Sequence, residues 1–561
     1  MAITGVVLFM MVPRAEAAPG DLDPTFSGDG KVLTDIAGGD DGASAMAIQP
    51  DGKIVTAGFA SPPAGGRTFV VVRYDSAGLP DPSFGDDGIV TTSFGGGSAA
   101  ARALAIEPDG DIVVAGTSSQ PETGWDFALA RYEPDGSLDA SFSDNGRVTT
   151  DFDDVANGIN ALAVQPNGKL VVAGESRGDF ALARYDTDGS LDTSFSGDGV
   201  VTTDFAGKAD AAYAVALLGD GRIVAAGSAF KKLDFYDAPQ FFALARYQAD
   251  GTPDSTFSGD GVLITDISDS FGNARAHAVA LQQDGKIVLA GAIGRGIFAA
   301  LVIARYNPSG SLDQSFARAY ENYAGARALA IQASRRIVAA GWTWFSESFD
   351  FVVTRWDSNG AWDSRFGGPR DPKSNSNPPG AVADFGLFNA DQARALAIQP
   401  DGKIVVAGRS EPGYDHSGDF ENDEPGDFAL ARYRMDSLDP PDADADGVTN
   451  DLDLCDRISS TPPDGCPHYA RTVTIRYSDR DAAFRGRVAS EQRDCREWPG
   501  VAIYRHRPGD DVQVGRPGSG PSYWVRFPRR PGWYYAKVER TLEWDFGVCE
   551  GARSPMLRVT K

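Results

Sequence analysis

The chain has 561 residues and a formal net charge of -26, and 42% of its residues are hydrophobic and 10% aromatic. These fractions allow a packed core and exclude a wholly disordered, collagen-like or coiled-coil protein. The 65 glycines and 34 prolines follow no three-residue period, which indicates many turns between short strands. Because the excess of acidic residues repels phosphate backbones, we expect no nucleic-acid partner.

The chain begins with an apolar run from Val6 to Val12, followed by the triplet Ala15, Glu16 and Ala17. This order is typical of a secretory signal peptide over residues 1–17, although no Lys or Arg precedes the run. The run is shorter than the ~20 residues of a membrane-spanning helix, and no later segment qualifies. We therefore expect a secreted or cell-surface protein without a membrane span.

Residues 18–438 contain one strand-rich unit seven times. Each copy is marked by the Ala-Gly pair that ends its second strand: Ala57-Gly58, Ala115-Gly116, Ala173-Gly174, Ala226-Gly227, Ala290-Gly291, Ala340-Gly341 and Ala407-Gly408. Seven copies of a unit with four short strands predict an all-β, seven-bladed β-propeller.

The phase of the repeat predicts how the ring closes. In the second copy the four strands are expected at Ala103–Glu107, Asp111–Ala115, Phe127–Tyr132 and Arg147–Phe152. The first of them is rich in small residues, which suits the crowded centre of a ring. In that phase the chain starts with an outer strand at Lys31–Ile36, and the last copy ends on a third strand at Phe428–Tyr433. We expect the N-terminal strand to complete the last blade and so to pair its open edge.

Asp-Gly or Asn-Gly stands between the first and second strands of six copies, which predicts two-residue hairpins with positive φ at both turn positions. The sixth copy departs from this pattern with Ser334, Arg335 and Arg336.

Three motifs resemble those of a known family: Leu-Asp-x-Ser-Phe-x-x-Asp-Gly at 138–146, with Asn145 in place of the second Asp; the turn at 397–405; and Phe-Ala-Leu-Ala-Arg-Tyr at 180–185. Over about residues 20–438 the chain is similar to the bacterial delta-60 repeat family. The resemblance implies a propeller-like fold in an exported bacterial protein, and it implies no activity. The residues from Ala317 to Tyr320, where the motif has Gly-Asp-Gly, leave one blade edge open to question.

Two charged positions recur in the copies. An arginine stands in every third strand, and an aspartate follows the first six of them, with one more before the first blade: Arg73, Arg131, Arg184, Arg246, Arg305, Arg355 and Arg432; Asp23, Asp81, Asp139, Asp192, Asp254, Asp313 and Asp363. A position that every blade needs is expected to hold blades together rather than to bind a ligand.

Function is sought where the copies differ, in the loops between the second and third strands on one face of the ring. Aromatic side chains in these loops can stack on sugars or hold peptides, or else they cap the blade core. The candidate ligand-binding residues are Trp125, Phe235, Tyr236, Trp342, Trp344 and Tyr414. The longest loop, at 409–427, also carries many acidic residues, which suit either a hard cation or a solvated surface. No residue is assigned a catalytic role.

After the repeats, the segment 439–470 carries Asp-x-Asp-x-Asp-Gly-x-x-Asn-x-x-Asp. Oxygen-bearing side chains at positions 1, 3, 5, 9 and 12, with Gly447 at the turn, have the spacing of a calcium loop, in which the carbonyl at position 7 is a further ligand. Residues 442–455 resemble a thrombospondin type 3 calcium repeat. Calcium is therefore expected as a structural cofactor, bound by Asp442, Asp444, Asp446, Val448, Asn450 and Asp453.

Residues 471–561 alternate apolar and polar residues in short runs, which predicts a small β-sandwich. This end of the chain is basic and is a candidate for contact with an anionic wall polymer; in rhythm it resembles the transthyretin-like domains of exported bacterial proteins. Four cysteines predict two disulfides with three pairings open, of which sequence neighbourhood favours the first two together and the last two together: Cys455, Cys466, Cys495 and Cys549.

The function expected from these features is that of a binding module for extracellular carbohydrate, peptide or protein. One alternative is an extracellular polysaccharide hydrolase or lyase that uses loop carboxylates, since two acids need only meet in space. A structural surface protein is another.

Overall fold

The computed structural model describes residues 18–434, except 37, 63–64, 96, 153–156, 206–208, 231–239, 268–272, 295–298, 317–318, 346–347, 364, 368–379, 387–388 and 413–424. It also gives the backbone of strands between 468 and 559. The chain divides after Asp436 into two compact units, and each is considered by itself. The expected signal peptide at 1–17 and the whole expected calcium loop at 442–453 lie outside the described residues.

The first unit consists of seven four-stranded antiparallel sheets. The first three are blade one, β2 (Asp40–Ile48), β3 (Ile54–Ser61), β4 (Thr68–Tyr74) and β5 (Ile89–Thr92); blade two, β6 (Ala99–Ile106), β7 (Ile112–Gln120), β8 (Gly124–Tyr132) and β9 (Arg147–Thr150); and blade three, β10 (Asn157–Val164), β11 (Leu170–Ser176), β12 (Asp179–Tyr185) and β13 (Val200–Thr203).

The next three sheets repeat the order. They are blade four, β14 (Ala211–Leu217), β15 (Ile223–Phe230), β16 (Gln240–Tyr247) and β17 (Val262–Thr265); blade five, β18 (Ala274–Leu281), β19 (Ile287–Ile293), β20 (Ala300–Tyr306) and β21 (Ala319–Asn322); and blade six, β22 (Ala324–Ile331), β23 (Ile337–Phe345), β24 (Ser348–Trp356) and β25 (Ala381–Ala383).

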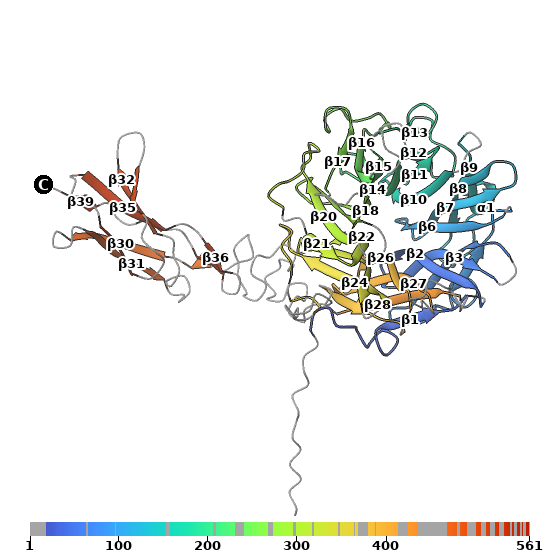
Figure 1. Ribbon diagram of the computed structural model, residues 1–561, viewed down its shortest axis with the longest axis horizontal. Helices are drawn as coiled ribbons and strands as arrows, with labels where there is room; N and C mark the ends of the chain where they lie inside the picture. The colour runs from blue at the N-terminus through green and yellow to red at the C-terminus, as the bar shows by residue number, and fades with distance from the viewer. Residues whose placement is uncertain are drawn as a thin grey trace, which may run out of the picture. The chain divides into compact units, whose positions relative to one another are not determined.

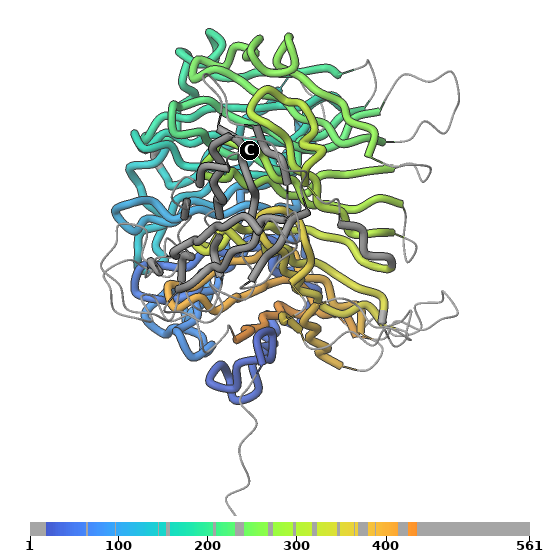
Figure 2. The backbone as a smooth tube through the Cα atoms, turned by 90° about the vertical axis from the view of Figure 1, so that its left-hand side faces the viewer, coloured from blue at the N-terminus to red at the C-terminus, as the bar shows by residue number. Residues whose placement is uncertain are grey.

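Blade seven joins the two ends of the ring. Its first three strands are β26 (Gln392–Ile398), β27 (Ile404–Ser410) and β28 (Asp427–Tyr433), and its outer strand is β1 (Lys31–Thr34) from the start of the chain. Strands β1 and β28 pair antiparallel, Lys31 opposite Ala431 and Thr34 opposite Phe428. The two ends of the propeller, blue and orange, lie side by side in Figure 2. The predicted seven-bladed propeller and its closure by the N-terminal strand are confirmed.

The first strand of every blade is the innermost, as its small residues predicted. Successive first strands contact one another around the whole ring, from β2 through β6, β10, β14, β18 and β22 to β26 and back to β2. Figure 1 shows these strands around the centre, with the fourth strands at the rim. Residues 317–320 depart from the motif, which left the outer edge of blade five open to question. Blade five nevertheless has its fourth strand, since β21 pairs with β20.

The hairpins between first and second strands differ from the prediction. In blade one, Gln49 N–H donates to the Lys53 carbonyl and Gly52 N–H donates to the Gln49 carbonyl, so the loop has three residues and only Gly52 has positive φ, +85°. A type I turn followed by a left-handed glycine is the second common hairpin connection. The prediction of two-residue turns was therefore wrong. In blade six Arg335 takes the glycine's place at φ +62°, which keeps the hairpin at some cost in strain.

The core lies between neighbouring blades. At the first boundary, Phe69 and Val71 of β4 pack with Val114 of β7 and Ala128 of β8, and all four are fully buried. Each blade is therefore stabilised by burial against both neighbours, as in other repeat proteins.

Among the described residues the one helical segment is α1 (Ser143–Gly146), a single turn, and no described helix is long and apolar enough to cross a membrane. The second unit contains three sheets: β29 (His468–Tyr469), β37 (Gly547–Cys549) and β36 (Thr541–Glu543); β30 (Arg471–Ser478), β31 (Ala483–Ser490) and β34 (Ser522–Arg526); and β33 (Val512–Gly515), β32 (Val501–His506), β35 (Gly532–Val538), β38 (Ala552–Arg553) and β39 (Leu557–Val559). The β-sandwich and its disulfides stay predictions.

Candidate functional site

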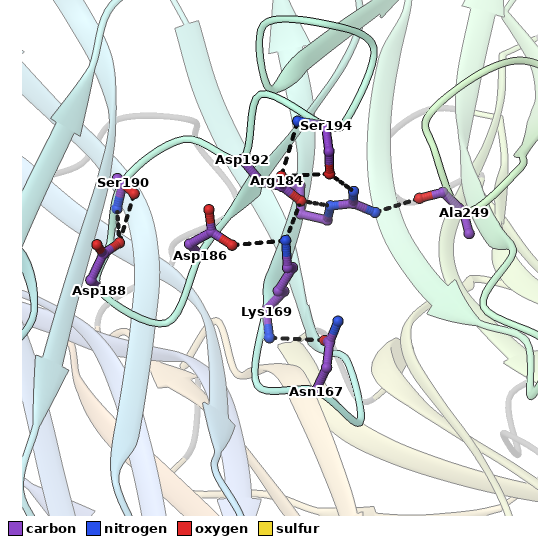
Figure 3. Close-up of polar contacts among 9 residues, drawn as sticks. All are labelled: Asn167, Lys169, Arg184, Asp186, Asp188, Ser190, Asp192, Ser194 and Ala249. Carbon is purple, nitrogen blue, oxygen red and sulfur yellow. Dashed lines mark hydrogen bonds and ion pairs between the residues drawn. The ribbon is translucent and has the colours of Figure 1, made fainter.

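The repeated arginine and aspartate of each blade form a clasp, and blade three shows how it reaches the next blade. In blade three, Arg184 Nε donates to Asp192 Oδ2 at 2.5 Å and Nη2 donates to Ser194 Oγ at 3.1 Å (Figure 3). Nη1 donates to the carbonyl oxygen of Ala249, in the turn that follows the third strand of blade four. Lys169 Nζ adds a second cation, 2.8 Å from Asp192 Oδ2. One buried arginine thus joins the third strand of blade three to the loop that follows it and to blade four.

The clasp recurs in all seven blades. Each guanidinium lies 4.6 to 4.8 Å from the centroid of a buried phenylalanine ring, a cation–π distance. The ion pairs are Arg73–Asp81, Arg131–Asp139, Arg184–Asp192, Arg246–Asp254, Arg305–Asp313, Arg355–Asp363 and Arg432–Asp23. The expectation that this ring serves as scaffold agrees with these contacts between blades.

The clasps predict loss of stability in acid. Burial by itself would raise the pKa of Asp254, but hydrogen bonds from Thr256 and Arg222 and the charge of Arg246 lower it, and the pKa of all seven clasp aspartates is below the ordinary value. Groups with a depressed pKa in the folded state stabilise it above their unfolded pKa, about 3.9, and lose that contribution as the pH falls. We expect the free energy of unfolding, measured with urea, to fall steeply below about pH 4. A flat profile there would contradict it.

A β-bulge in each first strand places one side chain at the centre of the ring. The pairing of first and second strands shifts register there, between Ala101 and Ala103 in blade two, and the same shift occurs in the other six blades. The skipped residues lie between small or apolar residues that are largely buried, but they themselves keep solvent contact: Ser44, Arg102, Asn160, Tyr213, His277, Arg327 and Arg394. We call these seven residues the channel ring.

The channel ring is basic although the chain is acidic. Arg102, Arg327 and Arg394 stand at the bulge of the innermost strands of blades two, six and seven, and the charge of Arg102 acts on the pKa of the other two. Burial, and then neighbouring guanidinium charges, lower the pKa of Arg394 to about 10. Guanidinium groups that act on one another in this way repel, and an anion bound between them would remove the repulsion.

A histidine and a tyrosine complete one side of the channel. Arg327 Nη1 lies 3.3 Å from both ring nitrogens of His277, and the ring centroids of His277 and Tyr213 are 5.1 Å apart. Burial, and then the charges of Arg327 and Arg275, lower the pKa of His277 well below its ordinary value. His277 is therefore a neutral imidazole at neutral pH, able to accept a proton or a hydrogen bond.

The predicted aromatic site is partly assembled. Trp342 and Trp344 of β23 meet Phe349 edge to face, with centroids 5.2 and 4.8 Å apart, and the added Cβ of an alanine at Gly325 would meet the Trp342 ring at 2.9 Å. Trp125 stands in blade two, 42% exposed, away from this cluster along the ring. Phe235, Tyr236 and Tyr414 lie outside the described residues.

Acidic side chains meet at four places in the described part of the chain, where one carboxylate oxygen from each of three residues lies within 4.8 Å of the others: Asp35, Asp41 and Asp427; Glu107, Asp109 and Asp111; Asp179, Asp204 and Asp210; Asp350, Asp384 and Asp391. Burial, and then the charges of Asp384 and Asp391, raise the pKa of Asp350 to about 7. Burial raises that of Asp391 to about 6, against the effect of the nearby Ser410 hydroxyl and the Phe385 amide. Oxygen ligands so grouped suit a hard cation.

Six stretches of the chain match the family model described as "Domain of unknown function (DUF5122) beta-propeller": residues 49–84, 107–142, 165–195, 218–257, 282–316 and 399–415. Six of the seven blades are similar to the DUF5122 repeat. The first five ranges each contain the arginine, aspartate and phenylalanine of one clasp, whereas the channel ring lies outside all six. The DUF5122 similarity therefore concerns the scaffold rather than the channel.

No curated protein matches the chain. Among solved structures, polysaccharide lyase Uly1 is 11% identical with a TM-score of 0.41, covering 70% of this chain and 90% of that one. An alpha-L-arabinanase of Cellvibrio cellulosa is 15% identical with a TM-score of 0.26, covering 52% and 93%, and a sucrose-6-phosphate hydrolase of Lactobacillus gasseri is 9% identical with a TM-score of 0.25, covering 72% and 86%. At these scores the similarities carry no argument about activity.

Proposed function

We propose that the protein is an extracellular binding module whose central channel takes an anionic group of a carbohydrate, peptide or protein ligand. The observation that carries the proposal is that Arg102, Arg327 and Arg394 stand at the bulges of the innermost strands, in a chain of net charge -26. Arginine presents a planar, permanently charged fork that matches carboxylate and phosphate oxygens.

The acidic surroundings support selectivity for the channel. Anions are repelled by most of an acidic surface, so a ligand with an anionic group gains from the arginines only when that group enters the channel. Trp342 lies against Gly325, two residues before Arg327 in β22, which gives an uncharged part of the ligand an aromatic surface nearby. The same proposal includes structural calcium in the loop at 442–453 and contact of the basic C-terminal unit with an anionic wall polymer.

The test is binding to polygalacturonate, a polymer of sugar carboxylates, with neutral dextran as the reference. Arg327→Gln and Arg394→Gln are each expected to raise the dissociation constant about tenfold or more, because a hydrogen bond to a charged group contributes about 1.5–3 kcal/mol. Arg335→Gln, at the exposed turn of blade six, is the matched control and should change nothing. Equal binding by all four proteins would contradict the channel as the site, and so would equal retention on dextran.

A second candidate function, a polysaccharide lyase, is favoured by His277 beside Tyr213 and Arg327. In such an elimination the neutral imidazole would take the proton next to the uronate carboxylate, the arginine would stabilise the developing charge, and the C–O bond to the leaving sugar would break as a C=C bond forms. The phenol would protonate the leaving oxygen. Measuring unsaturated ends released from polygalacturonate alongside binding decides between the two functions. Only a lyase releases such ends, and it should stop doing so in His277→Gln while binding persists.

A further inference from the structure

Three of the acidic groups have the same architecture at different blade boundaries. Each combines an aspartate at the start of a third strand, one just after the adjacent outer strand, and one at the start of the next blade's first strand. The boundaries are those between blades seven and one, three and four, and six and seven. Under the strand order of the propeller, all three lie on the face that carries the loops between second and third strands.

At two of these boundaries, backbone N–H groups donate hydrogen bonds to both carboxylate oxygens of the aspartate at the start of the first strand. Asp41 accepts hydrogen bonds from Ile36 N–H at 2.7 Å and from Phe428 N–H at 2.9 Å, one on each oxygen. Asp210 accepts from Phe205 N–H at 2.9 Å and Phe230 N–H at 3.2 Å, again with both oxygens. These two carboxylates therefore have a structural role that needs no ligand.

The boundary between blades six and seven is different. Oδ2 of Asp391 accepts from Phe385 N–H at 2.9 Å, and the side chain is 0% exposed. The Ser410 hydroxyl is near enough to lower the pKa of this carboxyl group, but no described residue has the geometry of a hydrogen bond to the buried Oδ1. A buried carboxylate oxygen without a hydrogen-bond partner destabilises the folded state, because its hydration in the unfolded chain is lost and not replaced.

A second buried polar atom at the same boundary also has no partner. At the boundary between blades one and two, Tyr132 Oη donates to Thr92 Oγ1 at 2.8 Å. Tyr433 is the corresponding tyrosine at the boundary between blades six and seven, but Ala383 stands where blade one has Thr92. The Tyr433 hydroxyl is fully buried and unpaired among the described residues, and the charges of Asp350 and Asp391 act on it.

We propose that Asp350, Asp384 and Asp391 bind a calcium ion between blades six and seven. Calcium–oxygen bonds of about 2.3–2.6 Å place two ligands of one ion at most about 5 Å apart, and the three carboxylate oxygens lie within 4.8 Å of one another. The ion would bind Oδ1 of Asp391, and a water molecule on the ion would hydrogen-bond to the Tyr433 hydroxyl.

The local charge agrees with a divalent ion. Lys31 Nζ hydrogen-bonds the backbone carbonyl of Asp384 at 2.8 Å, and its charge acts on Asp391. When all three carboxyl groups are ionised, one ammonium against three carboxylates leaves a net charge of two negatives, which one calcium ion balances.

The test uses the full chain, stripped of metal with a chelator and titrated with calcium in a calorimeter. Asp384→Asn, which changes an exposed side chain and keeps its size, is expected to lose one calcium ion per chain and most of the rise in melting temperature that calcium gives. Asp391→Asn should do the same, because it removes the charge but leaves an acceptor for Phe385. Calcium at the loop 442–453 is common to all variants and cancels in the comparison.

The matched control is Asp204→Asn at the boundary between blades three and four, which should keep the wild-type stoichiometry. Unchanged stoichiometry in Asp384→Asn and Asp391→Asn would overturn the proposal. So would loss of one ion in Asp204→Asn with none in Asp384→Asn, or magnesium bound at the site as tightly as calcium.

Discussion

Arg131→Ala is expected to lower the free energy of unfolding by about 3–5 kcal/mol, the range for breaking a buried ion pair from one side. Arg131 is 8% exposed and lies 2.5, 3.6 and 3.9 Å from carboxylate oxygens of Asp139, Glu107 and Asp111. Its Nη1 also donates to the Thr187 carbonyl of blade three at 2.6 Å. Its loss leaves three grouped carboxylates without a cation and removes a bond between blades.

Blade two is the sensitive blade because it lacks the second cation. Six copies have Lys or Arg at the position of Asp111: Lys53, Lys169, Arg222, Lys286, Arg336 and Lys403. Arg222→Ala in blade four is the control and should cost about 0–1 kcal/mol, since its side chain is 28% exposed and Arg246 still pairs with Asp254. Asp111→Lys should stabilise the protein. Chemical denaturation measures all three, and a cost for Arg131→Ala no larger than for Arg222→Ala would refute the account.

Removal of residues 18–35 is expected to abolish cooperative folding of the propeller. The deletion takes away β1, leaving the edge of β28 unpaired, and it removes two partners of Arg432, the carboxylate of Asp23 and the ring of Phe26. A large aromatic residue lost from a core costs about 3–5 kcal/mol, and an unpaired buried charge costs a similar amount. Together these approach the whole stability of a domain, about 5–15 kcal/mol.

Differential scanning calorimetry of the two chains tests this prediction. The control for shortening is a chain that lacks Ser437 to Lys561 instead. It should keep the melting transition of the propeller, because the propeller unit, which ends at Asp436, is compact by itself. A sharp transition near the wild-type temperature in the chain without residues 18–35 would show that the ring does not depend on its N-terminal strand.

The sequence predicted the fold well because the signal was repeated. Seven Ala-Gly pairs gave the blade count, and an unpaired strand at each end of the repeat gave the closure. The turn type was wrong because Asp-Gly suits two hairpin geometries, and the hydrogen bonds of Gln49 and Lys53 select the longer one.

The channel and the blade-boundary acids were missed for different reasons. The residue between the two alanines of Ala101 to Ala103 looks like the solvent-facing position of an ordinary strand, and only the bulge turns it toward the axis. Comparing that one position across the copies would have shown three arginines, a histidine and a tyrosine among seven residues. The acids between blades seven and one could not be grouped from the sequence, because Asp35 and Asp427 meet only when the ring closes.

Closure by the N-terminal strand also orders the events of folding. Arg432 Nη2 donates to Thr25 Oγ1, and these residues are 407 positions apart in the chain. The entropy of closing such a loop grows only with the logarithm of its length, so the distance changes the stability little, whereas contacts this far apart slow folding. The segment around β1 must therefore wait for the last repeat to be synthesised before it can pair, and a chain interrupted before β28 can form blades but cannot complete a ring.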